Sequence, residues 1–398
     1  MHLPLGVRTL DALCDAVRSS LAPLAADECA MPSVLPGQTW TSAGREIGPE
    51  VFSLSDRKDR PLVLAPTAEE VFTSLVAAEI DSYRSLPLRL YQIGNKYRDE
   101  VRPRFGLMRS REFVMKDMYT FDHNKDAALA TYDAVCNAYS DLFASLGLDS
   151  VRAAADSGDI GGDLSHEFHI KADLGEDALL ACPDSHCGFA ANVERVPEGT
   201  SAGDPCPQCN SEPLAQHRGI ELGHAFYLGT KYSAPLNASI NVPAGENGLT
   251  KSVPAQMGCY GIGVSRLYAA LQEVHGDNNG LRWPLHIAPY KVLLATPPPR
   301  ILASNPDMAA ATKSLTDSLA AAFPDSFILD DRDLSPGNKL KSASLLGIPA
   351  AVAITPKPSL SAKLSLRFVT PDGSHADAIH TQIPLPSVPD TLLQHLTI

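Results

Sequence analysis

Arginine is concentrated in one short stretch of this chain. Five arginines lie between positions 98 and 111, namely Arg98, Arg102, Arg104, Arg109 and Arg111. The neighbouring acids Asp99, Glu100 and Glu112 are too few to neutralise all of them. Guanidinium groups bind phosphate oxygens through paired hydrogen bonds, so the cluster predicts a site for a polyanionic ligand. For any single arginine, an exposed ion pair on a hairpin is the alternative.

Residues 66–70, PTAEE, place a hydroxyl and two carboxylates where a helix is expected to begin. Thr67 and Glu70 have the spacing of a capping box, which is one explanation for them. The other explanation is that Thr67 and Glu69 bind a cationic amine, because both side chains accept hydrogen bonds from an ammonium group. The sequence leaves both interpretations open.

Glycine recurs in MGCYGIGVSRLYAAL, residues 257–271. The glycines at 258, 261 and 263 allow a strand to approach a ligand closely, and Arg266 is expected in the first turn of the following helix. The segment matches neither the Rossmann glycine pattern nor the P-loop pattern, so both of those nucleotide folds are excluded.

Four of the eight cysteines form two close pairs: Cys182 and Cys187 in CPDSHC, and Cys206 and Cys209 in CPQC. Zinc ribbons tolerate two to four residues between paired ligands, so this spacing predicts a structural zinc site. A hairpin with reduced thiols and no metal is the alternative. His186 leaves the ligands of the first pair ambiguous.

Hydrophobic periodicity predicts the elements that position these residues. Helical spacing covers residues 7–26 and 126–146. An apolar strand at 88–93 and a second arm at 106–119 form a hairpin, and a strand that begins at Met257 runs into a helix. Hairpins with helices packed on one side indicate an α+β domain.

Charge and composition change near residue 288. The chain has a formal net charge of −13. Residues 289–398 hold nine Lys or Arg and nine Asp and are therefore neutral, so the preceding residues carry the entire net negative charge. The tail alternates strands with helices, at 291–296, 308–322, 326–330, 338–346 and 349–355, which predicts a parallel or mixed sheet covered by helices. We therefore expect two domains, 1–288 and 289–398.

The composition also excludes several classes of protein. An acidic balance argues against non-specific coating of nucleic acid. No apolar run reaches the ~18 residues that a membrane span needs, and neither fixed-period repeats nor low-complexity tracts are present.

Taken together, these segments resemble a class II aminoacyl-tRNA synthetase. YRDE with RPRFGLMRSREF resembles motif 2, GCYGIGVSRL resembles motif 3, and MPSVLP at 31–36 resembles motif 1, with Pro32 as its proline. The details are similar to the prolyl family of bacterial and mitochondrial type, as are residues 158–168, 219–233 and 330–349, so the resemblance covers nearly the whole chain. It implies an antiparallel class II sheet with flanking helices, followed by an α/β anticodon-binding domain.

The resemblance also implies roles for individual residues. For ATP it implies that Arg98 binds the α-phosphate and Arg109 the γ-phosphate, with Arg266 on the other side of the triphosphate. The remaining ATP residues would be Glu100 at the adenine amino group, Phe113 stacked on adenine and Glu221 at the ribose or Mg²⁺. The residues that bind proline would be Thr67, Glu69, Gly223, His224 and His166. For His166, a structural role in its hairpin is an equal alternative. Lys339 and Lys341 would contact the anticodon stem, unless they belong to a solvated helix face.

The implied activity is ligation of proline to its tRNA with ATP and Mg²⁺, by a homodimer that is not embedded in a membrane. Residues 197–218 form only a short loop where bacterial relatives carry an editing domain, so no hydrolytic clearance in cis is expected. The start looks truncated for this family, and the mitochondrial matrix is the expected location, with the cytoplasm as the alternative. Two other functions stay open: a tRNA-binding or nucleotide-sensing protein of the same fold without ligase activity, and a sister ligase for another amino acid.

Overall fold

The computed structural model describes residues 1–398 except 105, 159, 185, 197–198, 244–249, 356–358 and 397–398. The described chain divides into two compact units. The larger unit comprises Val17–Phe143 and Asp149–Ala270, and the C-terminal unit comprises Leu271–Ile398 with Met1–Ala16 and Ala144–Leu148. This division falls inside the predicted motif 3 helix, whereas the functional boundary at residue 288 stays a prediction.

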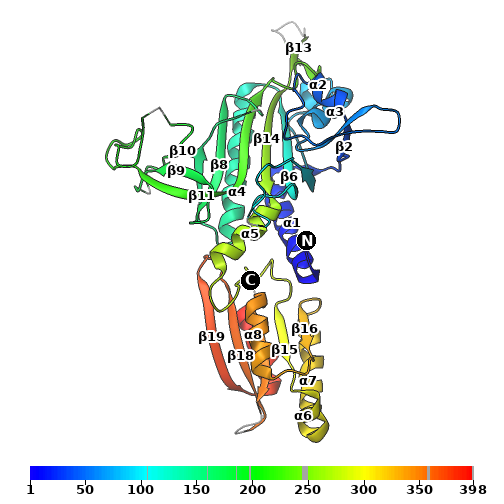
Figure 1. Ribbon diagram of the computed structural model, residues 1–398, viewed down its shortest axis with the longest axis vertical. Helices are drawn as coiled ribbons and strands as arrows, with labels where there is room; N and C mark the ends of the chain where they lie inside the picture. The colour runs from blue at the N-terminus through cyan, green and yellow to red at the C-terminus, as the bar shows by residue number, and fades with distance from the viewer. Residues whose placement is uncertain are drawn as a thin grey trace. The chain divides into compact units, whose positions relative to one another are not determined.

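A nine-stranded sheet forms the centre of the larger unit (Figure 1). Its strand order is β1-β5-β6-β14-β11-β8-β7-β10-β9, and every pairing is antiparallel except β1 with β5 and β10 with β7. The bounds are β1 Asp27–Glu28, β5 Leu88–Tyr97, β6 Glu112–Asp122, β7 Ser150–Ala154, β8 Leu164–Lys171, β9 Asp177–Ala181, β10 Ala190–Asn192, β11 Ala215–Gly229 and β14 Gln256–Gly263.

The predicted hairpin is β5 with β6, which pair in continuous register from Leu88 opposite Phe121 to Tyr97 opposite Glu112. Its second arm begins at Glu112 rather than at residue 106, because 106–108 form a turn and Arg104 pairs with Arg109 only in an isolated bridge. Most of the arginine cluster therefore lies in the connection between the strands.

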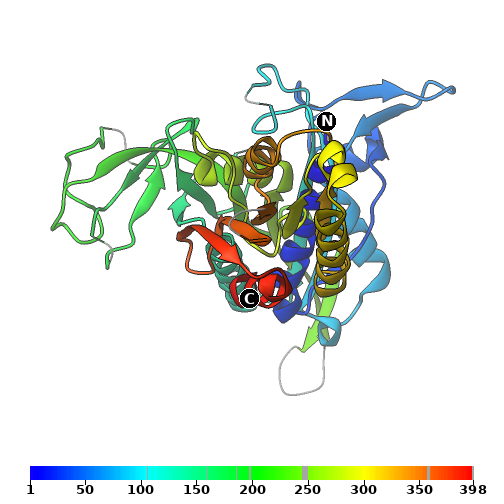
Figure 2. The same ribbon diagram turned by 90° about the horizontal axis from the view of Figure 1, so that it is seen from below.

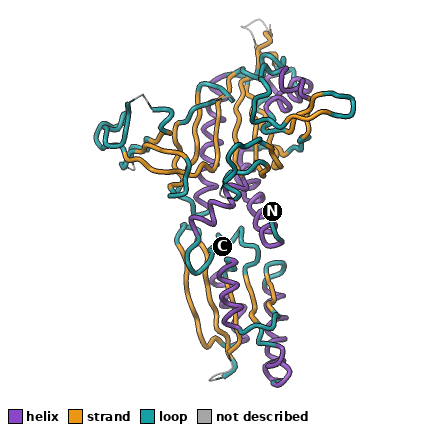
Figure 3. Tube along the Cα trace, viewed as in Figure 1, coloured by secondary structure: helices purple, strands orange, loops and turns teal. Residues whose placement is uncertain are grey.

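Helix α4, Lys125–Ser145, covers one face of the large sheet (Figures 1 and 3). Its rings Tyr139 and Phe143 pack against Phe168 of β8 at centroid distances of 5.4 and 5.8 Å. Both predicted helices of the N-terminal half are confirmed, α1 as Pro4–Leu21 and α4 nearly as expected. The remaining helices of the larger unit are α2 Gly37–Ser42, α3 Glu69–Glu79, η1 Ala22–Leu24 and η2 Tyr83–Ser85. Helices α1, α4 and α5 Val264–His275 each cross a boundary between the two units.

Two small sheets complete the larger unit. One is three-stranded, with β2 Val34–Pro36, β4 Pro61–Leu64 and β3 Ser53–Ser55 in that order. The other is the hairpin of β12 Ser239–Pro243 and β13 Thr250–Pro254.

The C-terminal unit has a mixed five-stranded sheet, as predicted from its alternating pattern. The order is β16-β15-β17-β18-β19, with β15, β16 and β17 parallel and the other pairings antiparallel. The bounds are β15 Val292–Ala295, β16 Phe327–Asp330, β17 Ala350–Thr355, β18 Ser361–Val369, β19 His375–Ile383, α6 Pro299–Ser304, α7 Pro306–Ala322, α8 Pro336–Leu346, η3 Leu385–Ser387 and α9 Val388–Leu396.

Both faces of this second sheet are covered by helices. Val292 and Leu294 of β15 pack into a cluster with α7 and α9, while Leu293 and Ala295 pack on the side of α8. Alternate residues of a strand point to opposite faces, which explains why β15 is apolar throughout. No helix of the described chain is long and apolar enough to cross a membrane.

Candidate active site

The two faces of the large sheet differ in chemistry. On β6, Lys116 points toward α4, where its ammonium contacts the Tyr139 hydroxyl and donates to the Tyr260 carbonyl at 3.0 Å. Its neighbours Met115 and Asp117 point the other way, because side chains alternate along a strand. The face away from α4 is the one that gathers the predicted ligand-binding residues.

Arg98 follows the end of β5 and is the best candidate for binding an anion. Its guanidinium lies 5.4 Å from the centre of the Phe113 ring, and no carboxylate of the described residues lies within ion-pair distance of it. Burial lowers the pKa of Arg98, and the nearby cation of Arg266 acts in the same direction. The Glu221 carboxylate acts in the opposite direction, but from beyond ion-pair distance. A partly buried guanidinium without a carboxylate in direct contact is suited to a ligand that supplies negative charge.

Three other arginines of the cluster are paired in this structure. Arg109 contacts Glu100 at 2.7 Å and Glu176 at 2.8 Å, and these two carboxylates raise its pKa. Arg104 also contacts Glu176, at 2.6 Å, and Arg111 lies 3.6 Å from Asp99. The sequence argument counted only local acids. It missed Glu176, which lies far along the chain and adds the carboxylate that the cluster lacked.

Arg266 lies in the first turn of α5, as predicted, and forms an ion pair with Glu221. Its Nη1 donates to a carboxylate oxygen of Glu221 at 2.7 Å, and its Nε donates to the carbonyl of Met108 at 3.0 Å. Burial opposes ionisation of Glu221, but the charges of Arg266, His224 and His169 together with the Arg266 hydrogen bond outweigh it and lower the pKa of Glu221 to about 2. Arg266 thereby connects β11 to the loop that carries Arg109.

A β-bulge between Glu221 and Gly223 decides which side chains of β11 face the site. The extra residue brings Glu221 and His224 to one face, with 3.8 Å between Oε1 and Nδ1, although their spacing of three would separate them in a regular strand. The Nε2 of His224 contacts the Ser165 hydroxyl at 2.5 Å, and burial lowers the pKa of His224.

The PTAEE segment does not form a capping box. Helix α3 begins at Glu69, its N-cap residue is Ala68, and no side chain caps it. Glu69 and Glu70 are both 0% exposed, and Arg45 approaches both of them. The Sγ of Cys259 donates to Oε1 of Glu69 at 3.2 Å, which places Glu69 over the motif 3 strand. The capping interpretation is therefore excluded, and the ligand-binding interpretation stays a prediction.

Two residues assigned to the proline pocket have neighbours on the α4 side of the sheet. His166 points toward α4, where its Nδ1 contacts the Tyr132 hydroxyl at 2.8 Å, and burial lowers its pKa to about 4. A Cβ on Gly223 would lie 2.9 Å from the Gly261 carbonyl and 3.4 Å from the Tyr139 ring, so a side chain at this position would lie on the α4 side. Glycine has no side chain, and its predicted place in the lining of the proline pocket stays a prediction. The His224 side chain lies on the same face as Glu221.

Lys339, which we predicted at the anticodon stem, lies in the interior of its unit, and this burial favours a structural role. Lys339 is 0% exposed, and its ammonium donates to the Thr296 carbonyl and the Asp330 carbonyl at 2.9 Å and to the Thr296 hydroxyl at 3.2 Å. It holds β15, β16 and α8 together, whereas Lys341 is exposed.

Sequence reasoning missed the network that supports the site. The Tyr119 hydroxyl accepts from the Ala68 amide at 2.7 Å and donates to Asp117 at 2.9 Å. Asp117 also forms a buried ion pair with Lys96 at 2.7 Å and accepts from Gln92 at 2.9 Å. The sequence pattern that could have identified these residues is the alternation of side chains along β5 and β6. It places polar residues at every second position, on the face opposite to α4.

The segment between β9 and β11 extends beyond β9 and β10 at one end of the sheet (Figures 1 and 2), and the four paired cysteines of this segment lie close together. Their sulfur atoms all lie within 4.8 Å of one another, with 3.7 Å between Cys182 and Cys209 and 3.6 Å between Cys187 and Cys206. Zinc–sulfur bonds of ~2.3 Å in a tetrahedron separate the sulfurs by about 3.8 Å, so this donor set fits Zn²⁺.

An antiparallel sheet with a motif 2 arginine, a motif 3 arginine and helices on one face defines a class II aminoacyl-tRNA synthetase core. The family described as tRNA synthetase class II core domain (G, H, P, S and T) matches residues 52–275. The chain belongs to the prolyl-tRNA synthetase family of this class, which confirms the sequence-based fold class.

Two relatives and one solved structure illustrate the similarity. "Probable proline--tRNA ligase, mitochondrial" of Rattus norvegicus is 43% identical over 357 residues, covering 88% of this chain and 72% of its own. "Proline--tRNA ligase" of Anaplasma marginale is 41% identical over 363 residues, covering 88% and 82%. Prolyl-tRNA synthetase from Cryptosporidium parvum, complexed with halofuginone and AMPPNP, shares the fold with a TM-score of 0.71 at 17% identity, over 100% of this chain and 72% of that chain.

Proposed function

We propose that this protein is an ATP-dependent proline–tRNA ligase. The proline carboxylate attacks the α-phosphorus of ATP, pyrophosphate leaves, and prolyl-adenylate forms. The terminal ribose hydroxyl of the tRNA then attacks the acyl carbon, and AMP leaves. A carboxylate is already a nucleophile, so the first step requires positioning and charge stabilisation rather than a general base.

One observation carries this proposal: no carboxylate of the described residues lies within ion-pair distance of Arg98, although the more distant charges of Glu221, Glu50 and Glu69 favour its cationic form. A zwitterionic amino acid needs a carboxylate for its amine and a cation beside its own carboxylate. Glu69 and Arg98 supply these two charges. Thr67 adds a hydroxyl next to Glu69, and His224 closes the pocket from β11.

We propose that Phe113 and Glu100 hold the adenine, while Arg98, Arg109 and Arg266 stabilise the phosphates. Arg109 exchanges its ion pairs with Glu100 and Glu176 for phosphate oxygens when ATP binds. Mg²⁺ accompanies ATP and neutralises phosphate charge. Glu221 can contribute to it only the carboxylate oxygen that is not engaged by Arg266.

A proline-dependent exchange of pyrophosphate into ATP tests this function directly. The wild-type protein should catalyse exchange with proline and not with other amino acids. No exchange with any amino acid would support the non-catalytic tRNA-binding alternative, and exchange with a different amino acid would support the sister-ligase alternative. Charging of total tRNA with labelled proline completes the test.

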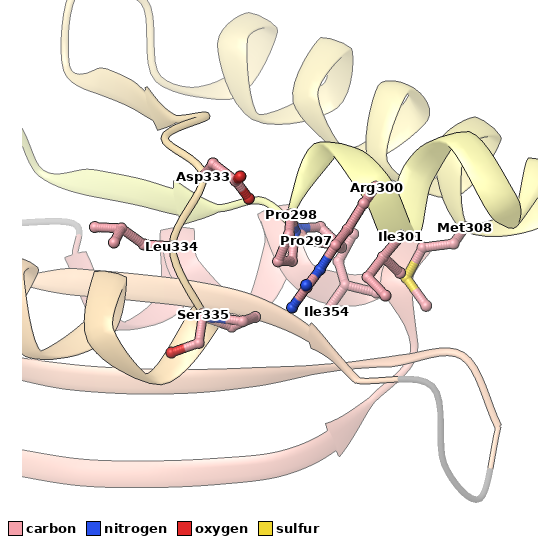
Figure 4. A pocket seen from close by; sticks show the side chains of 10 residues that line it. Pro297, Pro298, Arg300, Ile301, Met308, Asp333, Leu334, Ser335 and Ile354 are labelled. Atoms are coloured by element: carbon pink, nitrogen blue, oxygen red, sulfur yellow. The ribbon is translucent and has the colours of Figure 1, made fainter.

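For tRNA, we propose that residues 289–398 bind the anticodon stem and loop. A crevice of about 360 Å³ lies at the carboxyl ends of β15, β16 and β17 (Figure 4), where α/β sheets commonly bind ligands. Arg300 lies among its lining residues, with Asp333 and Ser335 on the opposite side. A cation beside an apolar hollow suits an unstacked base with its phosphate, and Lys341 adds a second cation on α8.

We propose that Cys182, Cys187, Cys206 and Cys209 hold one structural Zn²⁺. The side chains around them include Leu180 and Leu214, which form only a small apolar cluster, so a metal is the expected stabiliser of this excursion. Purified protein should contain about one zinc per chain, and Cys206→Ser should release it. Protein purified with no zinc and unchanged thermal stability after chelation would exclude the site.

We further propose a homodimer located in the mitochondrial matrix. The mitochondrial relatives support the compartment, while the bacterial relative of similar identity keeps the cytoplasm as the alternative. Sedimentation equilibrium of the purified chain and imaging of the tagged full-length gene product test the two proposals separately.

A further inference from the structure

Arg45 is the only cation of the described residues within ion-pair distance of the two buried glutamates at the start of α3. Its Nη1 lies 3.1 Å from Oε1 of Glu70 and 3.5 Å from Oε2 of Glu69, and it donates to the Thr67 hydroxyl at 3.4 Å. Arg45 thus touches both predicted proline ligands of this segment and a second carboxylate that has no assigned role.

The Arg45 side chain is held firmly in this position. Its guanidinium stacks over the Trp40 ring, 3.9 Å from the centroid, and only 14% of the side chain is exposed. Trp40 is itself buried and donates from its indole nitrogen to the Glu46 carbonyl at 3.0 Å. A stacked arginine in a closed turn is preorganised for its carboxylate partners.

The carboxylates nevertheless remain incompletely satisfied. Oε2 of Glu69 and Oε2 of Glu70 are buried and lack a hydrogen-bond partner among the described residues. Burial and the neighbouring Glu69 charge raise the pKa of Glu70 to about 7, whereas Arg45 favours its ionised form. With both glutamates ionised, two carboxylates and one guanidinium carry a net charge of −1. A buried excess charge is costly unless a ligand of opposite sign neutralises it, and the amine of a zwitterionic amino acid carries +1.

We propose that Arg45 and Glu70 form a charge-setting pair: Arg45 neutralises Glu70 and orients Thr67 and Glu69, so that the pocket matches a single cationic amine. Arg45 acts as a positioning residue, because it reaches the amino acid through Thr67 and Glu69. This inference rests on the proposed amino-acid activation.

The pair predicts an unusual pattern in a double-mutant cycle. Arg45→Ala leaves two uncompensated carboxylates, and Glu70→Gln lets Arg45 neutralise Glu69, so each single change should raise the KM for proline by roughly 10- to 100-fold. The double variant restores the net charge of −1 and should have a lower proline KM than either single variant. The KM for ATP should change less than about twofold in all three.

The measurement is pyrophosphate exchange at varied proline and varied ATP, with thermal unfolding of each variant. Arg60→Ala is the control, since Arg60 is an exposed arginine of the same unit paired with Asp56. Additive losses in the double variant, or equal changes in both KM values, would refute the charge-setting role. If Arg45→Ala does not fold, the Arg45→Lys and Glu70→Gln variants decide: the former should retain most of the proline affinity, and the latter should not. Absence of exchange in the wild-type protein would refute the proposed function itself, which is a distinct result.

Discussion

Replacement of Arg98 by alanine is the most informative single change, because this guanidinium lacks a carboxylate partner among the described residues. Removing it breaks no ion pair among the described residues. The variant therefore separates a contribution to catalysis from a contribution to folding, which few buried arginines permit.

The structure gives the size of both effects. Arg98→Ala removes the cation that we propose binds the reacting phosphate, and loss of one such donor costs ~3 kcal/mol or more, or about 100- to 1000-fold in rate. On folding, the variant loses a cation–π contact with Phe113 at 5.4 Å, worth ~0.5–1 kcal/mol, but it also escapes the cost of burying an unpaired charge. The free energy of unfolding should therefore change by no more than about 1 kcal/mol.

The assay is proline-dependent pyrophosphate exchange, accompanied by chemical denaturation. Arg102→Ala is the matched control, because Arg102 is exposed on the same connection and has no ion pair within the described part of the chain. It should exchange at nearly the wild-type rate. Near wild-type exchange by Arg98→Ala would refute the assignment of Arg98, and a large loss of stability would show that the guanidinium has a structural counter-ion after all.

Three further outcomes are expected. Glu69→Gln keeps the shape of the side chain but removes its charge, so it should raise the KM for proline far more than the KM for ATP, and equal effects on both would indicate a structural residue. Lys341→Ala should raise the KM for tRNA and reduce the slope of log affinity against log salt concentration by about one. Lys339→Met should leave tRNA kinetics unchanged. It should lower the free energy of unfolding by roughly 1–3 kcal/mol, because the buried carbonyl acceptors lose their donor. Purified protein should fail to deacylate alanyl-tRNA of the proline acceptor type, since residues 197–218 are too short for a second hydrolytic pocket, and efficient deacylation would contradict that reading.

Local pattern predicted the elements of this protein well. The hairpin of β5 and β6, helix α4, the motif 3 strand with its helix, and the alternating elements from β15 to β17 follow from periods of 2 and 3.6. The prediction ended at residue 355, so the hairpin of β18 and β19 and helix α9 were not anticipated.

The sequence by itself determined which residue types are available for binding: arginines for phosphate, a Thr and Glu for an amine, and four cysteines for zinc. Only the tertiary structure decided which of them face a common space. Glu176 neutralises arginines about 70 positions away, and a single bulge brings Glu221 to the side of His224.

The tertiary structure also explains why His166 and Lys339 lie elsewhere than the sequence suggested. His166 and His224 look equivalent in the chain, yet the alternation of β8 and β11 sends one toward α4 and the other toward the site. Lys339 reads as a surface cation, but the carbonyls of β15 and β16 surround its ammonium. A sequence pattern reports local periodicity and chemistry, whereas burial and ion pairing depend on segments that meet only when the chain folds.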